Sequence, residues 1–148
     1  MVLTSPIIRC LKKEYPDAII HYATKKAYEN IVTTNPAIDK VYTIEKEIDE
    51  ITEQLKAENY DFIIDLHHNL RTMRLKRRLK VPSAAFPKEN LNKLLLTQLK
   101  INRMPDVHIV DRYFKAVEPL NVKNDGEGLD FFIPPSDEVD LPSMGISG

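Results

Sequence analysis

The strongest chemical signal in this chain follows a short apolar run at residues 62–64. Asp65, His67, His68 and Arg71 come directly after that run, and together they could bind an anion, move a proton or hold a metal. An apolar run bounded by polar residues is typical of a strand buried on both faces, and open α/β sheets bind ligands beyond the carboxyl ends of such strands. We therefore expect these side chains to meet a substrate. The alternative is that Asp65 and a histidine cap the helix that follows.

A metal site is the weaker interpretation of the two adjacent histidines. Zinc sites need three or four converging ligands with an ordered second layer of hydrogen bonds, whereas neighbouring side chains at a strand end tend to point apart. We expect no metal ion and no cofactor, and we expect His67 to act as a hydrogen-bond partner of the ligand. Cys10 lies between Ile8 and Leu11 at helical spacing, which favours packing over nucleophilic chemistry.

A second candidate cluster lies on one face of a helix expected at residues 107–120. The apolar residues of this stretch share one arc of the helix, and His108, Asp111, Arg112 and Lys115 share the opposite face. His108 and Arg112 are about one helical turn apart, so both could reach the same anion. The alternative is a solvated face on which Asp111 pairs with Lys115.

Charge is segregated along the chain, although the net charge is only −1 at neutral pH. Residues 66–88 hold seven Lys and Arg side chains and no acid, whereas residues 45–61 hold seven acids and two lysines. Arg71, Arg74 and Arg78 line one face of a helix within the basic segment, and Arg71 is nearest to the strand end. This local positive field favours an anionic ligand. It does not indicate nucleic acid, because the overall charge is near neutral and the basic run lacks interleaved aromatic residues.

Length and composition describe an ordinary globular domain. The chain has 148 residues, of which 43% are hydrophobic and 29% charged, and this is enough to bury a core. Its longest apolar runs are too short to cross a bilayer, and residues 1–6 do not read as a signal peptide, so we expect a cytoplasmic protein. The only cysteine is Cys10, which excludes an internal disulfide.

Helices and strands are expected to alternate along the chain. Ser5 and Pro6 begin a helix that ends before Pro16, because proline is tolerated in the first turn of a helix and not in its interior. This alternation predicts an α/β fold, Rossmann-like, with a mainly parallel sheet and flanking helices. The other expected helices are at residues 25–33, 44–59, 70–80, 89–100 and 107–120, and the expected strands are at residues 18–23, 40–44, 61–66, 83–86 and 129–133.

Two absences qualify this expectation. All glycines lie near the C-terminus, so no GxGxxG or Walker-type loop follows an early strand, and nucleotide binding of the usual Rossmann kind is not expected. No strand precedes the first helix, where a doubly wound domain keeps a central strand. Residues 134–148 are rich in Ser, Asp, Pro and Gly, and we interpret them as a linker after a domain at residues 1–133.

Three segments, taken in order, carry a resemblance to a known family. They are residues 4–11 (Thr-Ser-Pro-Ile-Ile-Arg-Cys-Leu), residues 58–66 (Glu-Asn-Tyr-Asp-Phe-Ile-Ile-Asp-Leu) and residues 107–113 (Val-His-Ile-Val-Asp-Arg-Tyr). They resemble the first helix, the "NYD-hydrophobic-D" strand and the "H-x-V-[DE]-R" helix of the ADP-heptose:lipopolysaccharide heptosyltransferases, glycosyltransferase family nine. The resemblance covers nearly the whole chain.

The resemblance implies the N-terminal half of a GT-B fold that lacks its first strand. In that family an N-terminal domain receives the sugar acceptor and a C-terminal domain binds the ADP-sugar. The Ser-x-x-Gly-Asp-like turn that carries the family's proposed general base would fall just before Met1, and the donor domain would lie beyond Gly148. We therefore expect no catalytic residue in this chain, and we expect an acceptor-binding domain that is inactive alone.

The acceptor in this family is an anionic, phosphorylated and carboxylated saccharide lipid, for which guanidinium groups are suitable partners. The resemblance implies that Arg71, His108 and Arg112 bind the acceptor, and the position of His67 at the strand end adds that residue. The ADP-sugar donor would be reached only through the C-terminal domain. A peripheral association with the cytoplasmic face of the inner membrane stays open.

Two other interpretations also stay open. The chain could be a noncatalytic anion- or saccharide-binding module that uses the basic helix. It could also be a truncated gene product whose incomplete sheet exposes unpaired strand edges and apolar side chains, which would invite aggregation or dimerisation.

Overall fold

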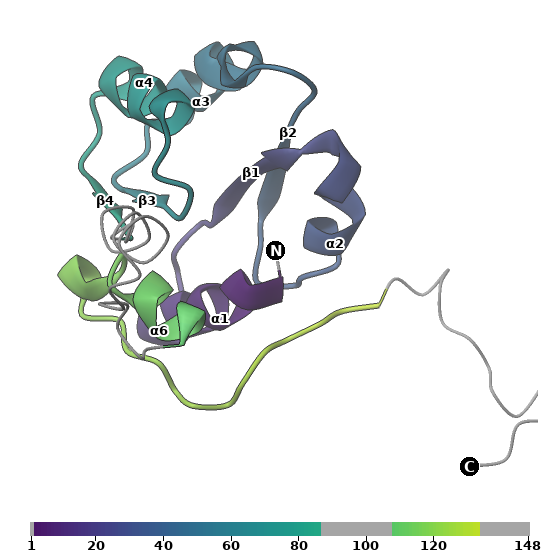
Figure 1. Cartoon of the computed structure of the whole chain (residues 1–148), viewed down its shortest axis with the longest axis vertical. Coiled ribbons are helices and arrows are strands. Elements are labelled where there is room, and N and C mark those ends of the chain that lie inside the picture. Colours follow the sequence, from purple (N-terminus) through teal and green to yellow (C-terminus); the bar gives the residue numbers. More distant parts are fainter. Residues whose placement is uncertain (1, 87–107, 134–148) are drawn as a thin grey trace, which may run out of the picture.

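The computed structural model describes residues 2–86 and 108–133 (Figure 1). Within these ranges the strands form two separate parallel pairs. The expected α/β fold with parallel strands is confirmed, although the strands occur as two small sheets rather than one. The strands are β1 (His21–Lys25) with β2 (Lys40–Ile44), and β3 (Ile63–Asp65) with β4 (Ser83–Ala85).

Helices cover both sides of the strands (Figure 1). One side carries α1 (Ser5–Glu14) and α6 (Ile109–Phe114), and the other side carries α3 (Thr52–Ala57) and α4 (Leu70–Leu79). Pro6 lies in the first turn of α1, as the sequence predicted. Asn69 caps α4, because its side chain accepts the Thr72 N–H at 3.0 Å while the Thr72 hydroxyl accepts the Asn69 N–H.

In the described part of the chain, β1 and β3 are each paired on one edge only, by β2 and β4 respectively. Just before β1, the Ile20 carbonyl accepts the Lys40 N–H, so the main chain of Ile20 faces β2. In β3, the Ile63 N–H donates to the Pro82 carbonyl at 2.9 Å, so Ile63 faces β4. Because main-chain groups alternate along a parallel strand, the main chains of Ala23 and Ile64 face away from their partners. Among the described residues, no strand pairs with either edge.

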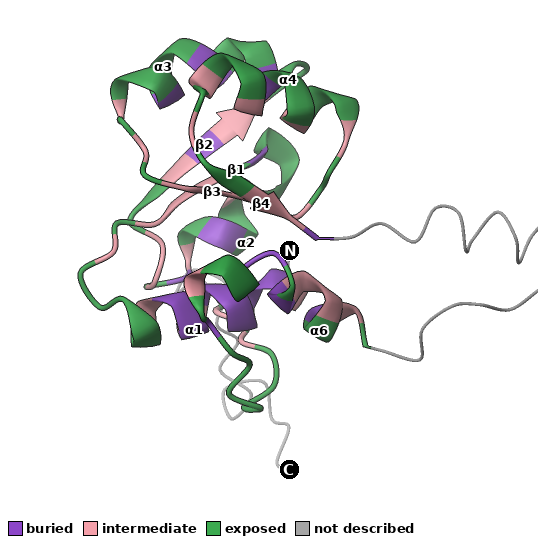
Figure 2. Ribbon diagram, turned by 90° about the vertical axis from the view of Figure 1, so that its left-hand side faces the viewer, coloured by how far each residue is buried: buried purple, intermediate pink, exposed green. Residues whose placement is uncertain are grey.

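Two apolar clusters form the core. The larger one lies between α1 and α6, and the smaller one lies under α3 and α4 (Figure 2). Cys10 is 4% exposed within the larger cluster, which confirms its packing role, and burial raises the pKa of its thiol. The buried members are Ile7, Cys10, Leu11, Val110, Phe114, Val117 and Val122 in the larger cluster, and Tyr42, Ile48, Ile51, Leu55 and Leu75 in the smaller one.

The first strand begins later than predicted. We expected residues 18–23, whereas β1 runs over His21–Lys25. Side chains hold the residues before it: Lys12 Nζ donates to the Ala18 carbonyl at 2.5 Å, and the Asp39 carboxylate accepts the Ile20 N–H at 2.7 Å. These bonds take up main-chain groups that a longer ladder would have used.

Near the end of the described chain, one predicted helix is shorter than expected and one predicted strand is wrong. The helix expected at 107–120 ends at Phe114, and a separate 3₁₀ turn, Glu118–Leu120, follows it; Pro119 has no N–H to continue an α-helix. Residues 129–133 do not form a strand. The Asp130 N–H donates to Ser5 Oγ at 2.8 Å, and the Phe132 carbonyl accepts from the Thr34 hydroxyl at 3.0 Å, so helix side chains rather than a strand bind this segment.

The remaining predictions differ in detail. The helix expected at 25–33 is a 3₁₀ turn, Lys26–Tyr28, followed by α2 (Glu29–Thr33), and the one expected at 44–59 is a 3₁₀ turn, Ile48–Ile51, followed by α3. The 40–44 strand is confirmed at both ends. The helix expected at 89–100 and the linker expected at 134–148 lie outside the described residues.

Candidate functional site

The turn between β3 and α4 is built on the carboxylate of Asp65. Asp65 is 5% exposed, and its Oδ1 accepts the N–H of His67 at 3.0 Å and the N–H of His68 at 2.7 Å. His68 has a φ of 42°, in the left-handed region that a residue other than glycine adopts only when its surroundings hold it there. Asp65 therefore holds the turn before α4 and is not its N-cap, because the N-cap of that helix is Asn69.

The second oxygen of Asp65 meets a lysine. Lys76 Nζ lies 2.7 Å from Asp65 Oδ2, and both side chains are largely buried. Burial raises the pKa of the Asp65 carboxyl, but Lys76, the N–H groups of the turn and Thr72 together outweigh burial and hold that pKa below its usual value. The pair fixes α4 to the end of β3.

Lys76 was not among the residues that the sequence singled out. A weak signal was present, because Lys76 lies on the same arc of its helix as the apolar Leu75 and Leu79, where a cation needs a buried partner. Nothing in the sequence indicated that Asp65, eleven positions earlier, was that partner.

His67 and Arg71 both lie near the carboxyl end of β3. The His67 side chain is exposed in the turn. Arg71, in the first turn of α4, is also exposed, and its Nη2 lies 3.4 Å from Glu47 Oε1. The guanidinium of Arg71 is therefore engaged on the flank of α4, beside the 3₁₀ turn that precedes α3.

His108 and Arg112 belong to α6. His108 is the exposed N-cap, and its Nδ1 accepts the Val110 N–H at 3.3 Å. Arg112 is half-buried, and its guanidinium carbon lies 5.9 Å from the centre of the Phe86 ring. The alternative of a fully solvated face is therefore only partly correct, since Arg112 covers an aromatic side chain.

The strand register brings two of the four predicted residues to one edge of the fold. Asp65 pairs with Ala85, and the Phe86 N–H donates to the Asp65 carbonyl at 3.3 Å. The His67 turn and the Arg112–Phe86 contact therefore both lie at the carboxyl end of the β3–β4 pair. Arg71 and His108 lie on opposite sides of the strands, on α4 and at the start of α6.

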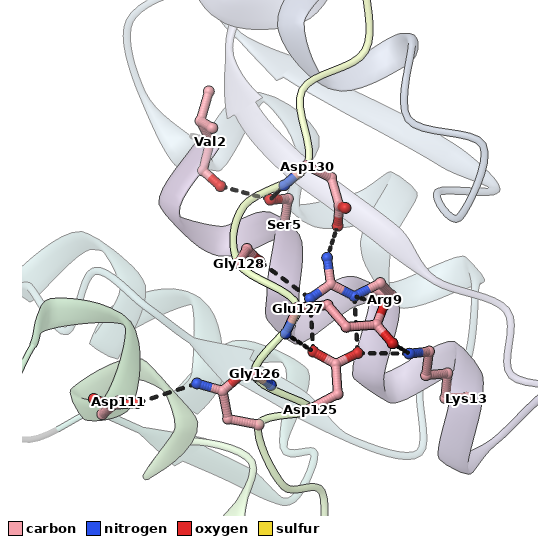
Figure 3. A network of polar contacts seen from close by, with 11 residues as sticks. Val2, Ser5, Arg9, Lys13, Asp111, Asp125, Gly126, Glu127, Gly128 and Asp130 are labelled. Atoms are coloured by element: carbon pink, nitrogen blue, oxygen red, sulfur yellow. Dashed lines mark hydrogen bonds and ion pairs between the residues drawn. The ribbon is translucent and has the colours of Figure 1, made fainter.

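A polar network joins α1 to residues 125–130 (Figure 3). Arg9 Nε and Nη2 donate to the two carboxylate oxygens of Asp125 at 2.9 and 2.7 Å, and its Nη1 donates to Asp130. Lys13 Nζ adds contacts to Asp125 at 2.7 Å and Glu127 at 3.0 Å. The sequence gave no signal for this network, because Arg9 and Asp125 are 116 positions apart. The network holds residues 125–130 against α1.

A hollow lies between α1, α2 and the segment near Asp130. Thr4 and Tyr22 line it, with their hydroxyl oxygens 3.1 Å apart, and burial raises the pKa of Tyr22. Ile31 and Phe131 lie on its apolar side. None of the four predicted acceptor residues lines this hollow.

Two general features of residues 2–86 and 108–133 bear on function. No three His, Cys, Asp or Glu side chains there gather as the ligands of a metal ion would. None of the helices in the same ranges combines the length and the apolar character that a bilayer span requires.

Comparison with known proteins identifies the class of fold. The solved structure of a glycosyl transferase family 9 protein from Veillonella parvula superposes with a TM-score of 0.73 at 22% identity, over 99% of this chain and 46% of that one. No family model matches the chain. The chain therefore shares its fold with about half of that GT-B-like structure.

Sequence comparison gives the more particular relationship. The chain is 29% identical over 137 residues to lipopolysaccharide heptosyltransferase 3 of Escherichia coli K12, covering 82% of this chain and 39% of that protein. A second Escherichia coli lipopolysaccharide heptosyltransferase 3 is 34% identical over 76 residues, covering 45% of this chain and 22% of that protein. The chain is therefore similar in sequence to lipopolysaccharide heptosyltransferases and similar in fold to a glycosyl transferase family 9 protein. It spans less than half the length of each of these relatives.

Proposed function

We propose that this chain forms the acceptor side of a glycosyltransferase that moves heptose, or a related sugar, from an ADP-sugar to a lipopolysaccharide core on the cytoplasmic side of the inner membrane. The observation that carries the proposal is the 29% identity over 137 residues to a lipopolysaccharide heptosyltransferase. The solved structure supports the fold to which that activity belongs.

The proposed acceptor contacts start from the carboxyl end of the β3–β4 pair. His67 offers an exposed imidazole there, and Arg112 offers a guanidinium held against Phe86. A half-buried guanidinium binds phosphate or carboxylate more strongly than a fully solvated one, because less water screens the charge. Arg71 and His108 would extend the contact on either side once the acceptor displaces Glu47 from Arg71.

We propose that transfer also needs polypeptide outside the span that aligns with this chain. Sugar transfer with inversion requires a base for the acceptor hydroxyl and cationic groups for the leaving diphosphate. The described residues offer no carboxylate that is both free and placed at the proposed acceptor edge, since Asp65 is engaged with Lys76 and with the turn. The chain should therefore bind acceptor without turning it over.

Calorimetric titration of the purified chain with a phosphorylated inner-core saccharide tests this proposal. We expect measurable binding that Arg112→Ala weakens about tenfold or more, because a charge-assisted bond to an anion contributes roughly 1.5–3 kcal/mol. Arg78→Ala is the matched control, since it removes one guanidinium that pairs with Asp49 away from the proposed edge.

Two outcomes would overturn the assignment. One is the absence of any saccharide binding, and the other is an equal loss of binding in the Arg112 and Arg78 variants. A separate assay with ADP-heptose and acceptor tests the catalytic part. Turnover by this chain alone, at a rate comparable with that of a full-length heptosyltransferase, would contradict the need for further polypeptide.

A further inference from the structure

The outward face of α4 combines exposed apolar side chains with cations. At about 100° per residue, Leu75 and Leu79 point to the core, and Leu70, Met73, Arg74 and Arg77 form the opposite stripe. Leu70 is 74% exposed and Met73 is 37% exposed. The helix lies at the edge of the molecule (Figures 1 and 2). An apolar patch at the start of a cationic stripe is therefore exposed to solvent.

The cations of α4 divide into engaged and free groups. Lys76 pairs with Asp65, and the flank of the helix next to the Ile48–Ile51 turn pairs Arg71 with Glu47 and Arg78 with Asp49. Arg74 and Arg77 have no hydrogen bond or ion pair within the described part of the chain. The free cations are thus those that share the outward stripe with Leu70 and Met73.

We propose that this outward stripe of α4, formed by Leu70, Met73, Arg74 and Arg77, docks the domain on the surface of an anionic lipid bilayer. The apolar side chains would enter the headgroup region, and the guanidinium groups would bind lipid phosphates. A helix of this kind lies in the plane of the interface, and each cation near an anionic surface adds to the binding.

The arrangement of side chains favours a bilayer over a dissolved anion or a nucleic acid. A soluble anion would bind the guanidinium groups only. The exposed Leu70 side chain beside them would add nothing to its binding. A single-stranded nucleic acid would use aromatic side chains for stacking, and the outward stripe has none. A duplex would use only the cations and would leave Leu70 and Met73 without a partner. A lipid surface uses both the apolar and the cationic parts of the stripe.

The inference deepens the proposed function, on which it rests in one respect: a lipid-linked acceptor is presented at a bilayer. The two can still fail separately. Docking through α4 requires only anionic lipid and no saccharide, whereas acceptor binding requires the edge formed by His67 and Arg112.

Co-sedimentation with lipid vesicles tests the docking surface. The full chain is mixed with vesicles of phosphatidylglycerol and phosphatidylcholine, or of phosphatidylcholine alone. We expect partition onto the anionic vesicles only, and a decrease at high salt, because the Debye length falls from about 10 Å at 0.1 M to about 3 Å at 1 M. The double variant Arg74→Ala/Arg77→Ala should lower the partition coefficient about 30-fold, at roughly fivefold for each cation.

Two further variants separate the stripe from general charge. Leu70→Gln keeps helix propensity and removes the apolar contact, and it should lower partition about tenfold. Arg78→Ala/Lys56→Ala makes the same change in net charge as the arginine pair, but its cations pair with Asp49 and Glu53, so partition should change less than twofold. Circular dichroism should show the same helix content in every variant.

Several results would overturn the proposal. They are no partition of the unchanged chain onto anionic vesicles, equal partition onto neutral vesicles, or equal losses in the stripe and control pairs. The surface would be reassigned to nucleic acid if the chain bound RNA and not vesicles, and if Arg74→Ala/Arg77→Ala abolished the RNA binding.

Discussion

Lys76 Nζ lies 2.7 Å from Asp65 Oδ2 in a place where the Asp65 side chain is 2% and the Lys76 side chain 17% exposed. The same carboxylate holds the turn that carries His67 through two main-chain N–H groups. One buried ion pair therefore fixes both the direction of α4 and the turn at the proposed acceptor edge. Helix, strand end and candidate site depend on the same contact.

Removal of the lysine should destabilise the fold strongly. Lys76→Met fills similar space and leaves the Asp65 carboxylate buried without its cation, which costs roughly 3 kcal/mol in free energy of unfolding. Urea unfolding followed by circular dichroism measures this. The double variant with Asp65→Asn should recover part of the loss, since no uncompensated charge remains. A loss below about 0.5 kcal/mol for Lys76→Met, which is typical of surface changes, would contradict the structural role.

The free energy of unfolding should fall in acid. Arg9, Lys13 and the Glu127 N–H outweigh burial and lower the pKa of Asp125, and the contacts of Asp65 lower its pKa as well. A folded pKa below the unfolded value near 3.9 means that the folded chain binds protons less readily. The contribution is then fully present above about pH 5 and is lost as the pH falls through the folded pKa.

Unfolding midpoints in urea across an acid pH series check this sign. The variant Asp65→Asn/Asp125→Asn should be less stable than the unchanged chain at neutral pH, and its stability should depend less on pH below about pH 5. Parallel pH profiles for the two proteins would show that other carboxylates govern the acid response.

Arg9 should be needed to hold residues 125–130 against α1. Its fork binds both oxygens of Asp125 and also reaches Asp130 and the Gly128 carbonyl (Figure 3). Arg9→Lys keeps the charge, but an ammonium group cannot make the paired bonds of the planar guanidinium. We therefore expect the free energy of unfolding to fall by about 1–2 kcal/mol and proteolysis within residues 123–133 to be faster. Lys13→Ala is the control, because Lys13 is half exposed and an exposed pair contributes about 0–1 kcal/mol. Unchanged proteolysis of Arg9→Lys would mean that the Ser5 and Thr34 contacts suffice.

Local patterns predicted the elements that depend on local chemistry. Pro6 and the apolar spacing of α1 gave that helix correctly, and the residues at 40–44 gave β2 at both ends. The strand at 61–66 was found from its apolar run, although the ladder occupies only Ile63–Asp65 and both isoleucines are half-buried. Each of these predictions depended on residues only a few positions apart in the sequence.

The failures share a different cause, because each depends on partners far along the chain. Leu129–Ile133 has the composition of a strand, but the Asp130 N–H goes to Ser5 and no strand lies beside it among the described residues. Asp65 seemed free for a ligand because Lys76 is hidden on another element. The contact of Arg112 with Phe86 was not predicted, because Phe86 follows β4 and is distant from Arg112 in the sequence.

Hydrogen exchange should reveal the unpaired edges of β1 and β3. The Ile63 N–H donates to the Pro82 carbonyl, and the register gives Tyr22 a ladder bond to β2, whereas Ala23 and Ile64 present their N–H groups away from their partners. We expect the Ala23 and Ile64 amides to exchange at least tenfold faster than those of Tyr22 and Ile63, because an amide without a ladder bond needs no opening step. Exchange resolved by NMR at single residues, with each neighbouring pair as its own control, measures the ratio. Equal protection of Ala23 and Tyr22 would mean that another strand occupies the edge of β1 in solution. If that protection of Ala23 decreases when the protein is diluted, the other strand belongs to a second copy of the chain.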